Sequence, residues 1–283
     1  MTDLQAVEFE LLKQFIAVCE ELKLTYYLVC GSALGAVKYK GFIPWDDDID
    51  VALPRKDYEI FCNEAPKKLP EWCFLQNYHT ERKYYRIGSK LRDSRTTYIE
   101  CMAENLDINH GVFIDIFPLD GQWKTKTEEK IFKKKLADFE AARRVRLRYH
   151  RLSPQNIFML RTNLYRLLFL LFGYKSNTAK EAEAFDKYIA SFKTENSDIW
   201  CNHANSTSVL EYAPKEQYGE GTWLTFEGMP VRVPEKYDEY LTQKYGDWRA
   251  EPEKAEQKGH HFYTKCDLDK PFTEYINKNT NKN

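Results

Sequence analysis

The first forty residues alternate between helical and extended patterns of apolar side chains. Apolar residues recur every three or four positions from residue 4 to residue 22, which predicts a helix with Asp3 as its N-cap. Residues 26–30 are aromatic and β-branched, as is typical of a buried strand. A glycine and Ser32 follow, and residues 33–38 are expected to form a short helix capped by Ser32. The chain therefore begins in the order helix, strand, helix.

Shorter apolar runs predict further strands and one helix up to residue 122. The expected elements are a strand over residues 49–53, a helix over 56–64, and strands over 84–91, 96–100 and 112–117. Strands that alternate with helices in this way favour an α/β (α+β) fold built on a small mixed sheet.

The second half of the chain is predicted to be mainly helical until it reaches a hairpin and a last helix. Helical patterns cover residues 127–151, 157–172, 178–192 and 235–245, and a hairpin is expected over 223–233. The first of these helices is strongly basic, whereas the second is apolar. The apolar helix is shorter than the ~20 residues that a spanning helix needs, so we do not expect it to cross a membrane.

Four carboxylates fall within the five residues Asp46–Asp50, directly before an apolar alternation. In a strand, Asp48 and Asp50 would point to the same face, because successive side chains alternate. Two carboxylates at that spacing repel each other unless a cation lies between them. Mg²⁺ prefers such oxygen ligands and completes its coordination with water and substrate phosphate, with Mn²⁺ as the alternative ion. The pair is therefore a candidate metal site for phosphoryl chemistry.

Three other interpretations of the acidic segment compete with a magnesium site. The first is a solvated acidic turn, because charge runs usually mark exposed faces. A calcium-binding EF-hand loop fails, since Val51 stands where that loop needs glycine and Asp57 where it needs glutamate. The metal-binding Asp-x-Asp motif of a glycosyltransferase is expected at the end of an apolar strand, whereas here the polar segment precedes the strand.

The residues before the acidic segment favour phosphate binding. A strand, a Gly-Ser turn and a helix N-terminus together present free backbone N–H groups to an anion. Gly31 and Ser32 alone would usually mark only a turn. Placed about fifteen residues before paired strand carboxylates, they predict a phosphate cradle beside a metal site.

Residues 31–38 and 41–50 resemble the signature of the LicD family. Its members are phosphocholine transferases of bacterial surface polysaccharides, are distantly similar to fukutin-related ribitol-phosphate transferases, and belong to the polymerase-beta-like nucleotidyltransferase superfamily. That superfamily combines an apolar strand, Gly-Ser, an Asp-x-Asp pair and a third carboxylate on a later strand. Here the third would be Asp115, within residues 111–120, which also resemble the family's sequence. An aspartate inside an apolar strand is unfavourable to bury unless it is paired or bound to a metal.

The resemblance continues more weakly toward the C-terminus. Residues 90–99 resemble the family's basic strand, and residues 226–234, 245–248 and 260–261 resemble its closing motifs in order. The stretch 123–205 carries no motif that the family would explain.

The resemblance implies an enzyme that transfers a phosphorylated alcohol, with phosphocholine favoured. The donor would be CDP-activated, the acceptor would be a hydroxyl of a lipopolysaccharide or teichoic-acid precursor, and CMP would be released. Asp48, Asp50 and Asp115 are implied as catalytic residues and metal ligands, with Asp115 also a candidate to take the proton of the attacking hydroxyl. The implied donor-binding residues are Gly31, Ser32, Lys38, Lys90, Arg92, His260 and His261.

On this interpretation the chain has three parts. Residues 1–122 would form the nucleotidyltransferase-like catalytic core, 123–205 a basic and apolar helical segment, and 206–283 a C-terminal segment that packs back on the active site. Two alternatives remain open: a nucleotidyltransferase that moves NMP to a small molecule or protein, and a non-catalytic glycan- or nucleotide-binding protein on the same scaffold.

Composition narrows the class of protein. A formal net charge of −1 argues against a general nucleic-acid binder. The seven cysteines contain no C-x-x-C pair and predict reduced thiols, and the N-terminus lacks the apolar stretch of a signal peptide, so we expect a cytoplasmic protein. The His260-His261 pair with Cys266 matches no standard zinc spacing.

The helix over residues 157–172 leaves two interpretations open. It is either a core helix or, with the arginines between Arg143 and Arg151, a peripheral contact with the cytoplasmic face of a membrane. An acceptor glycan built on a lipid carrier would be held at that face.

Overall fold

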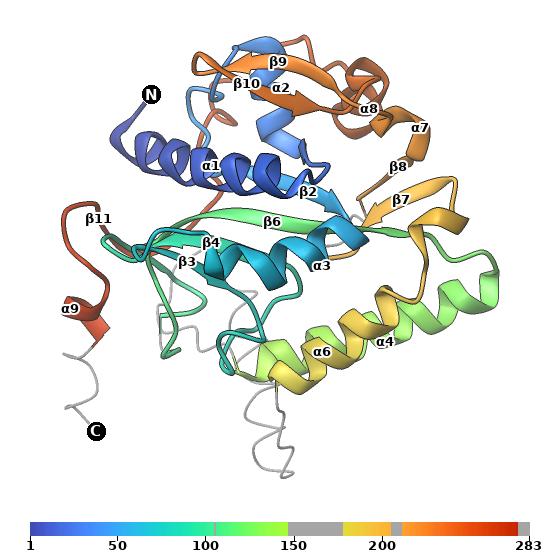
Figure 1. Ribbon diagram of the computed structural model, residues 1–283, viewed down its shortest axis with the longest axis horizontal. Coiled ribbons are helices and arrows are strands. Elements are labelled where there is room, and N and C mark those ends of the chain that lie inside the picture. Colours follow the sequence, from blue (N-terminus) through green and yellow to red (C-terminus); the bar gives the residue numbers. More distant parts are fainter. Residues whose placement is uncertain (105, 147–177, 205–210, 277–283) are drawn as a thin grey trace.

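The computed structural model describes residues 1–104, 106–146, 178–204 and 211–276. A mixed sheet runs through the centre, with the long strand β6 in its middle (Figure 1). In spatial order its strands are β1 (Tyr27–Leu28), β2 (Asp50–Pro54), β6 (Val112–Gly121), β4 (Ser89–Asp93) and β3 (Cys73–Gln76). Outside this order, β7 (Ile199–Asn202) pairs with β6 and also with β8 (Glu211–Pro214). Strands β2 and β6 run parallel, whereas the other described pairs of this sheet are antiparallel. The predicted α/β class with a mixed sheet is confirmed.

Helices α1 (Asp3–Leu22) and α3 (Arg55–Glu64) lie against each other and pack on β6. Helix α1 buries Leu11, Leu12 and Phe15 completely, which is the apolar face that its spacing predicts. Its N-cap is Thr2 rather than the predicted Asp3. The Thr2 hydroxyl accepts a hydrogen bond from the Gln5 backbone N–H, and the Gln5 side chain accepts one from the Thr2 N–H.

The turn between β1 and α2 (Cys30–Lys38) corrects two further predictions. Strand β1 covers two residues rather than the expected 26–30, because Cys30 adopts a left-handed φ of 53° and ends the extended backbone. Helix α2 begins at Cys30 with Val29 as its N-cap, so Ser32 lies inside the first turn and does not cap the helix.

The strands expected over 84–91 and 96–100 differ from the structure in extent and partner. Strand β4 begins only at Ser89. Strand β5 (Thr97–Glu100) stands outside the central sheet and pairs with β11 (Tyr263–Asp267) from the C-terminal part of the chain. Strands β3, β7, β8 and β11 were not predicted.

The helical middle of the chain is described in part. Helices α4 (Lys126–Arg146) and α6 (Thr178–Ile189) correspond to two of the predicted helices and pack against each other beside the sheet (Figure 1). The apolar helix expected over 157–172 lies outside the described residues. Within the described part of the chain, no helix is both long and apolar enough to cross a membrane. The division into three parts stays a prediction.

The hairpin expected over 223–233 is confirmed as β9 (Thr222–Phe226) and β10 (Met229–Val233). Its turn residues Glu227 and Gly228 have φ values of 47° and 82°, as a tight type I′ turn requires. Helix α8 (Tyr237–Tyr245) follows close to its predicted position. The short elements are the 3₁₀ helices Ala65–Lys67 and Thr194–Asn196 and the helices α7 (Lys215–Tyr218) and α9 (Thr273–Ile276).

Candidate active site

The register of the sheet brings three carboxylates together. Asp50 on β2 lies directly opposite Asp115 on β6, and Asp48 precedes β2. One carboxylate oxygen from each of Asp48, Asp50 and Asp115 lies within 4.8 Å of the others. The structure therefore shows the proximity expected for Asp115, although more than sixty residues separate it from the pair.

This donor set fits a divalent cation. The three carboxylates supply hard oxygen atoms, which Mg²⁺ and Mn²⁺ prefer. Burial raises the pKa of the Asp48 carboxyl, and the negative charges of Asp115 and Asp47 raise it further against the opposing effect of His261. A cation between these groups would remove that repulsion. The assignment of the three residues as metal ligands stays a prediction.

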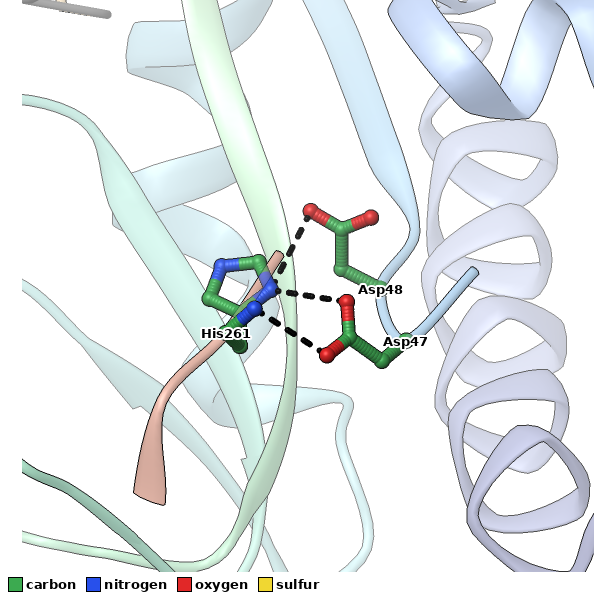
Figure 2. A group of neighbouring side chains, drawn as sticks. All are labelled: Asp47, Asp48 and His261. Carbon is green, nitrogen blue, oxygen red and sulfur yellow. Dashed lines mark hydrogen bonds and ion pairs between the residues drawn. The ribbon is translucent and has the colours of Figure 1, made fainter. Parts of the chain in front are cut away.

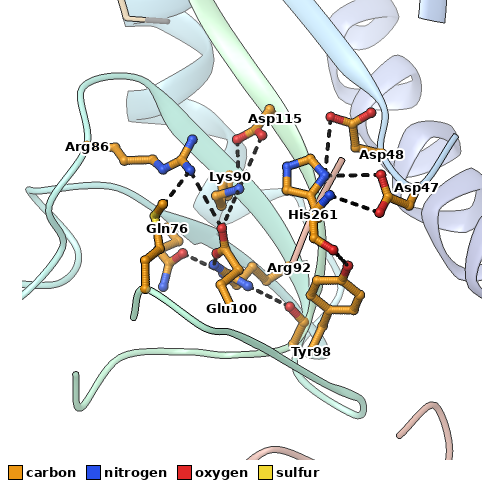
Figure 3. A network of polar contacts seen from close by, with 12 residues as sticks. Asp47, Asp48, Gln76, Arg86, Lys90, Arg92, Tyr98, Glu100, Asp115 and His261 are labelled. Carbon is orange, nitrogen blue, oxygen red and sulfur yellow. Dashed lines mark hydrogen bonds and ion pairs between the residues drawn. The ribbon is translucent and has the colours of Figure 1, made fainter. Parts of the chain in front are cut away.

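Lys90 is the buried counter-charge of Asp115. It lies opposite Asp115 in the pairing of β4 with β6, and its Nζ is 3.0 Å from Asp115 Oδ1 and 3.8 Å from Glu100 Oε1 (Figure 3). Burial lowers the pKa of Lys90 to about 8, although the two carboxylates act against this. The ammonium group is thus engaged by two acidic side chains of the protein.

Arg92 lies deeper in the same network. Its guanidinium donates to Glu100 Oε2 at 2.9 Å and to the carbonyl oxygen of Gly111 at 2.7 Å, and its Nε donates to Gln76 (Figure 3). Burial raises the pKa of Glu100, but Lys90 and the neighbouring arginines outweigh it and hold that pKa well below its usual range. Arg92 is fully buried and fixes Glu100 rather than facing a cavity.

Arg86 is a candidate that the sequence did not single out. Its guanidinium lies beside Lys90 and Asp115 in Figure 3, yet its partners are weak. Nη2 is 3.7 Å from Glu100 Oε1 and 3.9 Å from the sulfur of Met102, and the buried Nε has no hydrogen-bond acceptor. Because Arg86 falls inside a stretch predicted to be strand, its position near the carboxylates gave no signal in the sequence.

Gly31 and Ser32 hold α2 against the acidic segment. The Ser32 hydroxyl accepts a hydrogen bond of 2.8 Å from the Asp50 backbone N–H, which ties the helix to the strand of the metal pair. A Cβ atom on Gly31 would lie 2.7 Å from Asp46 Oδ2, so a larger residue would require the Asp46 side chain to move. Both residues lie where a phosphate cradle was expected, and that role stays a prediction.

A cavity of about 410 Å³ opens beside these residues, within the size range of small-molecule sites. One wall comes from α2 and residues 43–50, and the other from the C-terminal part of the chain. The lining residues are Cys30, Gly31, Leu34, Lys38, Tyr39, Ile43, Trp45, Asp46, Asp48, Asp50, Lys244, Tyr245, Trp248, Ala250, Pro252, Glu256 and His260. Among the predicted site residues, Ser32, Lys90, Arg92, Asp115 and His261 lie outside this lining.

The Asp47 side chain connects the C-terminal wall of the cavity to the wall formed by α2 and residues 43–50. Its carboxylate accepts hydrogen bonds from the backbone N–H groups of His260, at 2.9 Å, and His261, at 3.0 Å, and lies 3.3 Å from Nδ1 of His261 (Figure 2). A methyl group on Gly259 would overlap Asp47 Oδ2, so glycine is needed for this approach. Burial raises the pKa of Asp47, but the hydrogen bonds from the two histidines outweigh it and lower that pKa.

The two predicted histidines therefore differ in their contacts. His260 is exposed and reaches the lining of the cavity, whereas His261 is half-buried against Asp47 and Asp48. Burial lowers the pKa of His261, but the bond to Asp47 and the charge of Asp48 raise it above its ordinary value. Within the described residues, the groups close enough to share a metal ion contain no cysteine.

Comparisons with known proteins agree with this arrangement. Residues 23–154 match the family model described as LicD/FKTN/FKRP, nucleotidyltransferase domain. Over 274 residues the chain is 29% identical to the lipopolysaccharide cholinephosphotransferase LicD of Haemophilus influenzae, which covers 91% of this chain and 94% of that protein. A shorter match, 24% identical over 100 residues, covers 35% of this chain and 27% of the uncharacterized protein RT0683 of Rickettsia typhi.

The matched region contains the acidic segment, the strand that carries Asp115 and the buried Lys90. The three carboxylates thus lie in the part of the chain that the family model describes. Over residues 23–154, this chain is therefore similar to the LicD/FKTN/FKRP nucleotidyltransferase domain family.

Proposed function

We propose that this protein is a transferase that moves phosphocholine from a CDP-activated donor to a hydroxyl of a cell-surface glycan and releases CMP. The observation that carries the proposal is the group of three carboxylates on adjacent strands beside a cavity. Similarity to a lipopolysaccharide cholinephosphotransferase along nearly the whole chain supports both the donor group and the class of acceptor.

Asp48, Asp50 and Asp115 would hold Mg²⁺ or Mn²⁺. When bound, such an ion neutralises charge on the attacking and leaving oxygen atoms of an in-line displacement at phosphorus. Gly31, Ser32 and the start of α2 would bind donor phosphate through the backbone and a hydroxyl group. Burial of Ser32 beside the Asp50 backbone supports a fixed position for that hydroxyl.

Basic residues would orient the donor around these carboxylates. Lys38 lines the cavity, but its Nζ also contacts the carbonyl oxygens of Trp248 and Ala250 and the Glu251 carboxylate, so we assign it mainly to positioning the cavity wall. Lys90 would act through Asp115. Arg86, with its poorly paired guanidinium, is better suited than the fully engaged Arg92 to contact a phosphate group.

The proton of the attacking glycan hydroxyl needs an acceptor. Asp115 is our candidate, because its carboxylate is one of the three that lie within 4.8 Å of one another. The ammonium group of Lys90 lies 3.0 Å from Asp115 Oδ1 and holds that carboxylate in place.

The acceptor would be a lipopolysaccharide-type glycan or a teichoic-acid precursor on a lipid carrier. The basic residues from Arg143 to Arg151 and the apolar stretch 157–172 would then bring the protein to the membrane that carries it. Arg143, the described member of this run, forms an ion pair of 2.6 Å with Glu140. Arg148, Arg151 and the apolar stretch lie outside the described residues.

Release of CMP from a panel of donors tests the proposal. The purified protein would be incubated with CDP-choline, CDP-ethanolamine, CDP-glycerol or CDP-ribitol and a glycan acceptor, with Mg²⁺ or with EDTA. We expect Mg²⁺-dependent CMP release that is fastest with CDP-choline. Release of pyrophosphate from CTP, with the nucleotide retained on an acceptor, would instead identify a nucleotidyltransferase. Absence of both products would leave the non-catalytic binding protein.

A further inference from the structure

Four aromatic side chains line the cavity beside the metal carboxylates. They are Tyr39, Trp45, Tyr245 and Trp248. The rings of Tyr39 and Trp45 are 6.2 Å apart between centroids and meet at 78°, so they form two adjacent walls. Trp45 directly precedes Asp46 and is half-buried, which leaves part of its ring open.

A lysine or arginine side chain lies close to each of three of these rings, those of Tyr39, Tyr245 and Trp248. Lys38 Nζ lies 5.5 Å from the centre of Tyr39, and Lys244 Nζ lies 5.7 Å from the centre of Tyr245. The Arg249 guanidinium lies 4.2 Å from the centre of Trp248. The described part of the chain places no lysine or arginine over Trp45. Its ring is the aromatic wall best able to accept an external cation.

The charges around the cavity favour a cation as well. Besides the assigned metal ligands, the lining contains the carboxylates of Asp46 and Glu256. Its two lysines have protein partners, since Lys38 is paired with Glu251 and Lys244 lies against Tyr245. Once a divalent ion balances Asp48 and Asp50, the lining still contains the exposed acidic side chain of Glu256 and the carboxyl group of Asp46, which follows Trp45 in the chain.

We propose that Trp45, with Tyr39 as the adjoining wall and with Asp46 and Glu256 in the lining of the same cavity, binds the trimethylammonium group of the donor. The inference rests on the proposed function, because it names the part of that donor which the cavity selects. Only a short ethylene linker separates phosphate from nitrogen in phosphocholine. A headgroup on Trp45 would therefore keep its phosphate near the carboxylates of Asp48 and Asp50, three and five residues later in the chain.

The competing occupant of this wall is the cytosine ring of the donor. A nucleobase between aromatic side chains would stack parallel to them, whereas Tyr39 and Trp45 meet at nearly a right angle. Rings at such an angle are typical of a cage around a quaternary ammonium group. The geometry therefore favours the headgroup.

The test compares two ligands of the same shape and different charge. Phosphocholine and 3,3-dimethylbutyl phosphate differ in that carbon replaces the quaternary nitrogen. We expect isothermal titration calorimetry of the full chain with Mg²⁺ to give about tenfold tighter binding of phosphocholine, since a desolvated cation–π contact is worth roughly that factor. Trp45→Leu should abolish the preference, and Trp45→Phe, which keeps a weaker aromatic face, should retain part of it.

Trp223→Leu is the matched control, because Trp223 is half-exposed on β9 and does not line the cavity. It should bind both ligands as the unchanged protein does. Equal affinity of the unchanged protein for the two ligands would overturn the proposal. So would a Trp45→Leu variant that loses CMP binding as severely as phosphocholine binding, because that result would identify a base-stacking wall.

Turnover separates failure of this inference from failure of the proposed function. With CDP-choline, Trp45→Leu should raise KM about tenfold, whereas its KM for CDP-glycerol should change less than twofold. CMP release from CDP-choline without preference for the charged ligand would disprove the cation site and preserve the transferase. Preference for phosphocholine without CMP release from any donor would preserve the cation site and disprove the transferase.

Discussion

Three consecutive aspartates have different surroundings and therefore different affinities for a proton. Burial, together with the charges of Asp48 and Asp47, raises the pKa of Asp46 to about 8. Asp47 has a lowered pKa, because the hydrogen bonds from two histidines outweigh its burial. Asp48 has a raised pKa through burial and through its carboxylate neighbours. Replacement of each aspartate by asparagine should consequently have a different effect.

At Asp48 and Asp50 we expect loss of activity without loss of the fold. Asp48→Asn or Asp50→Asn removes one of two mutually repelling carboxylates, so the metal-free protein should be as stable as before or more stable. Turnover should fall on the order of a hundredfold or more, because several kcal/mol of transition-state stabilisation depend on the metal. Circular dichroism melts and CMP release on the same preparations measure both effects. Near-normal activity in both variants would refute the metal assignment.

Asp115→Asn should affect chemistry more than donor binding. A metal ligand or proton acceptor contributes mainly in the transition state, so kcat should fall strongly while KM for the donor changes little. Steady-state kinetics over a range of CDP-choline concentrations separate the two constants. An increase in KM with unchanged kcat would assign Asp115 to donor binding instead.

At the scale of elements, the C-terminal part of the chain from Gly246 to Phe262 has little regular structure but forms a wall of the cavity. It is held by side chains of the core, chiefly Asp47 and Lys38. Its position therefore depends on these polar contacts and on the buried ring of Trp248 rather than on a packed helix. Such segments are expected to open locally more easily than the sheet.

Asp47→Asn should loosen this wall. The asparagine can accept with only one of its two terminal atoms, so at least one bond to the His260 or His261 backbone is lost, at about 1–3 kcal/mol. We expect faster hydrogen exchange across residues 246–262 and a higher KM for the donor. Asp247→Asn, at an exposed aspartate of the same segment, is the control and should change neither. Unchanged exchange in Asp47→Asn would show that the wall does not depend on this carboxylate.

A buried histidine should make the packing around α4 sensitive to acid. His203 is fully buried against the rings of Trp123 and Phe132, and burial lowers its pKa to about 4. The pKa of His203 in the folded protein therefore lies below the value of about 6.5 that a histidine has in the unfolded chain. Stability from the neutral imidazole is therefore complete above pH 6.5 and is lost as the pH falls toward 4.

Urea denaturation between pH 7 and pH 4 measures this effect against His203→Gln. The unchanged protein should lose up to about 3 kcal/mol more free energy of unfolding than the variant over that range. His79→Gln, at an exposed histidine, should follow the unchanged protein. Equal acid sensitivity of the His203 variant and the unchanged protein would contradict the prediction.

The sequence predicted the elements around the site better than the contacts between distant segments. Alternation predicted that Asp48 and Asp50 lie close together, although β2 begins only at Asp50, and the hairpin turn at Glu227 followed from local residues. The left-handed conformation of Cys30 has no local signal, so the start of α2 was wrong. The pairing of β5 with β11 joins segments more than 160 residues apart, and no periodicity within either strand specifies it.

At the scale of the whole molecule, the role of the basic helix in reaching a membrane can be tested directly. Each basic residue near an anionic surface contributes about 1 kcal/mol, so the arginines from Arg143 to Arg151 should give salt-sensitive association. In liposome sedimentation we expect pelleting with anionic vesicles at low salt. Changing Arg143, Arg144, Arg146 and Arg148 to glutamine should reduce it. A protein that stays in the supernatant at low salt would favour the alternative, in which the apolar stretch belongs to the core.

The two walls of the cavity are synthesised at different times during translation. The ribosome completes α2, β2 and β6, with their carboxylates, long before it reaches the residues from Lys244 to His261 that close the cavity. Because the N-terminal part of a chain folds first, the nascent protein would display its acidic face to water without a place for a substrate. The protein would then become active only when the last part of the chain has been translated. A chain whose translation stops before that part would be inactive.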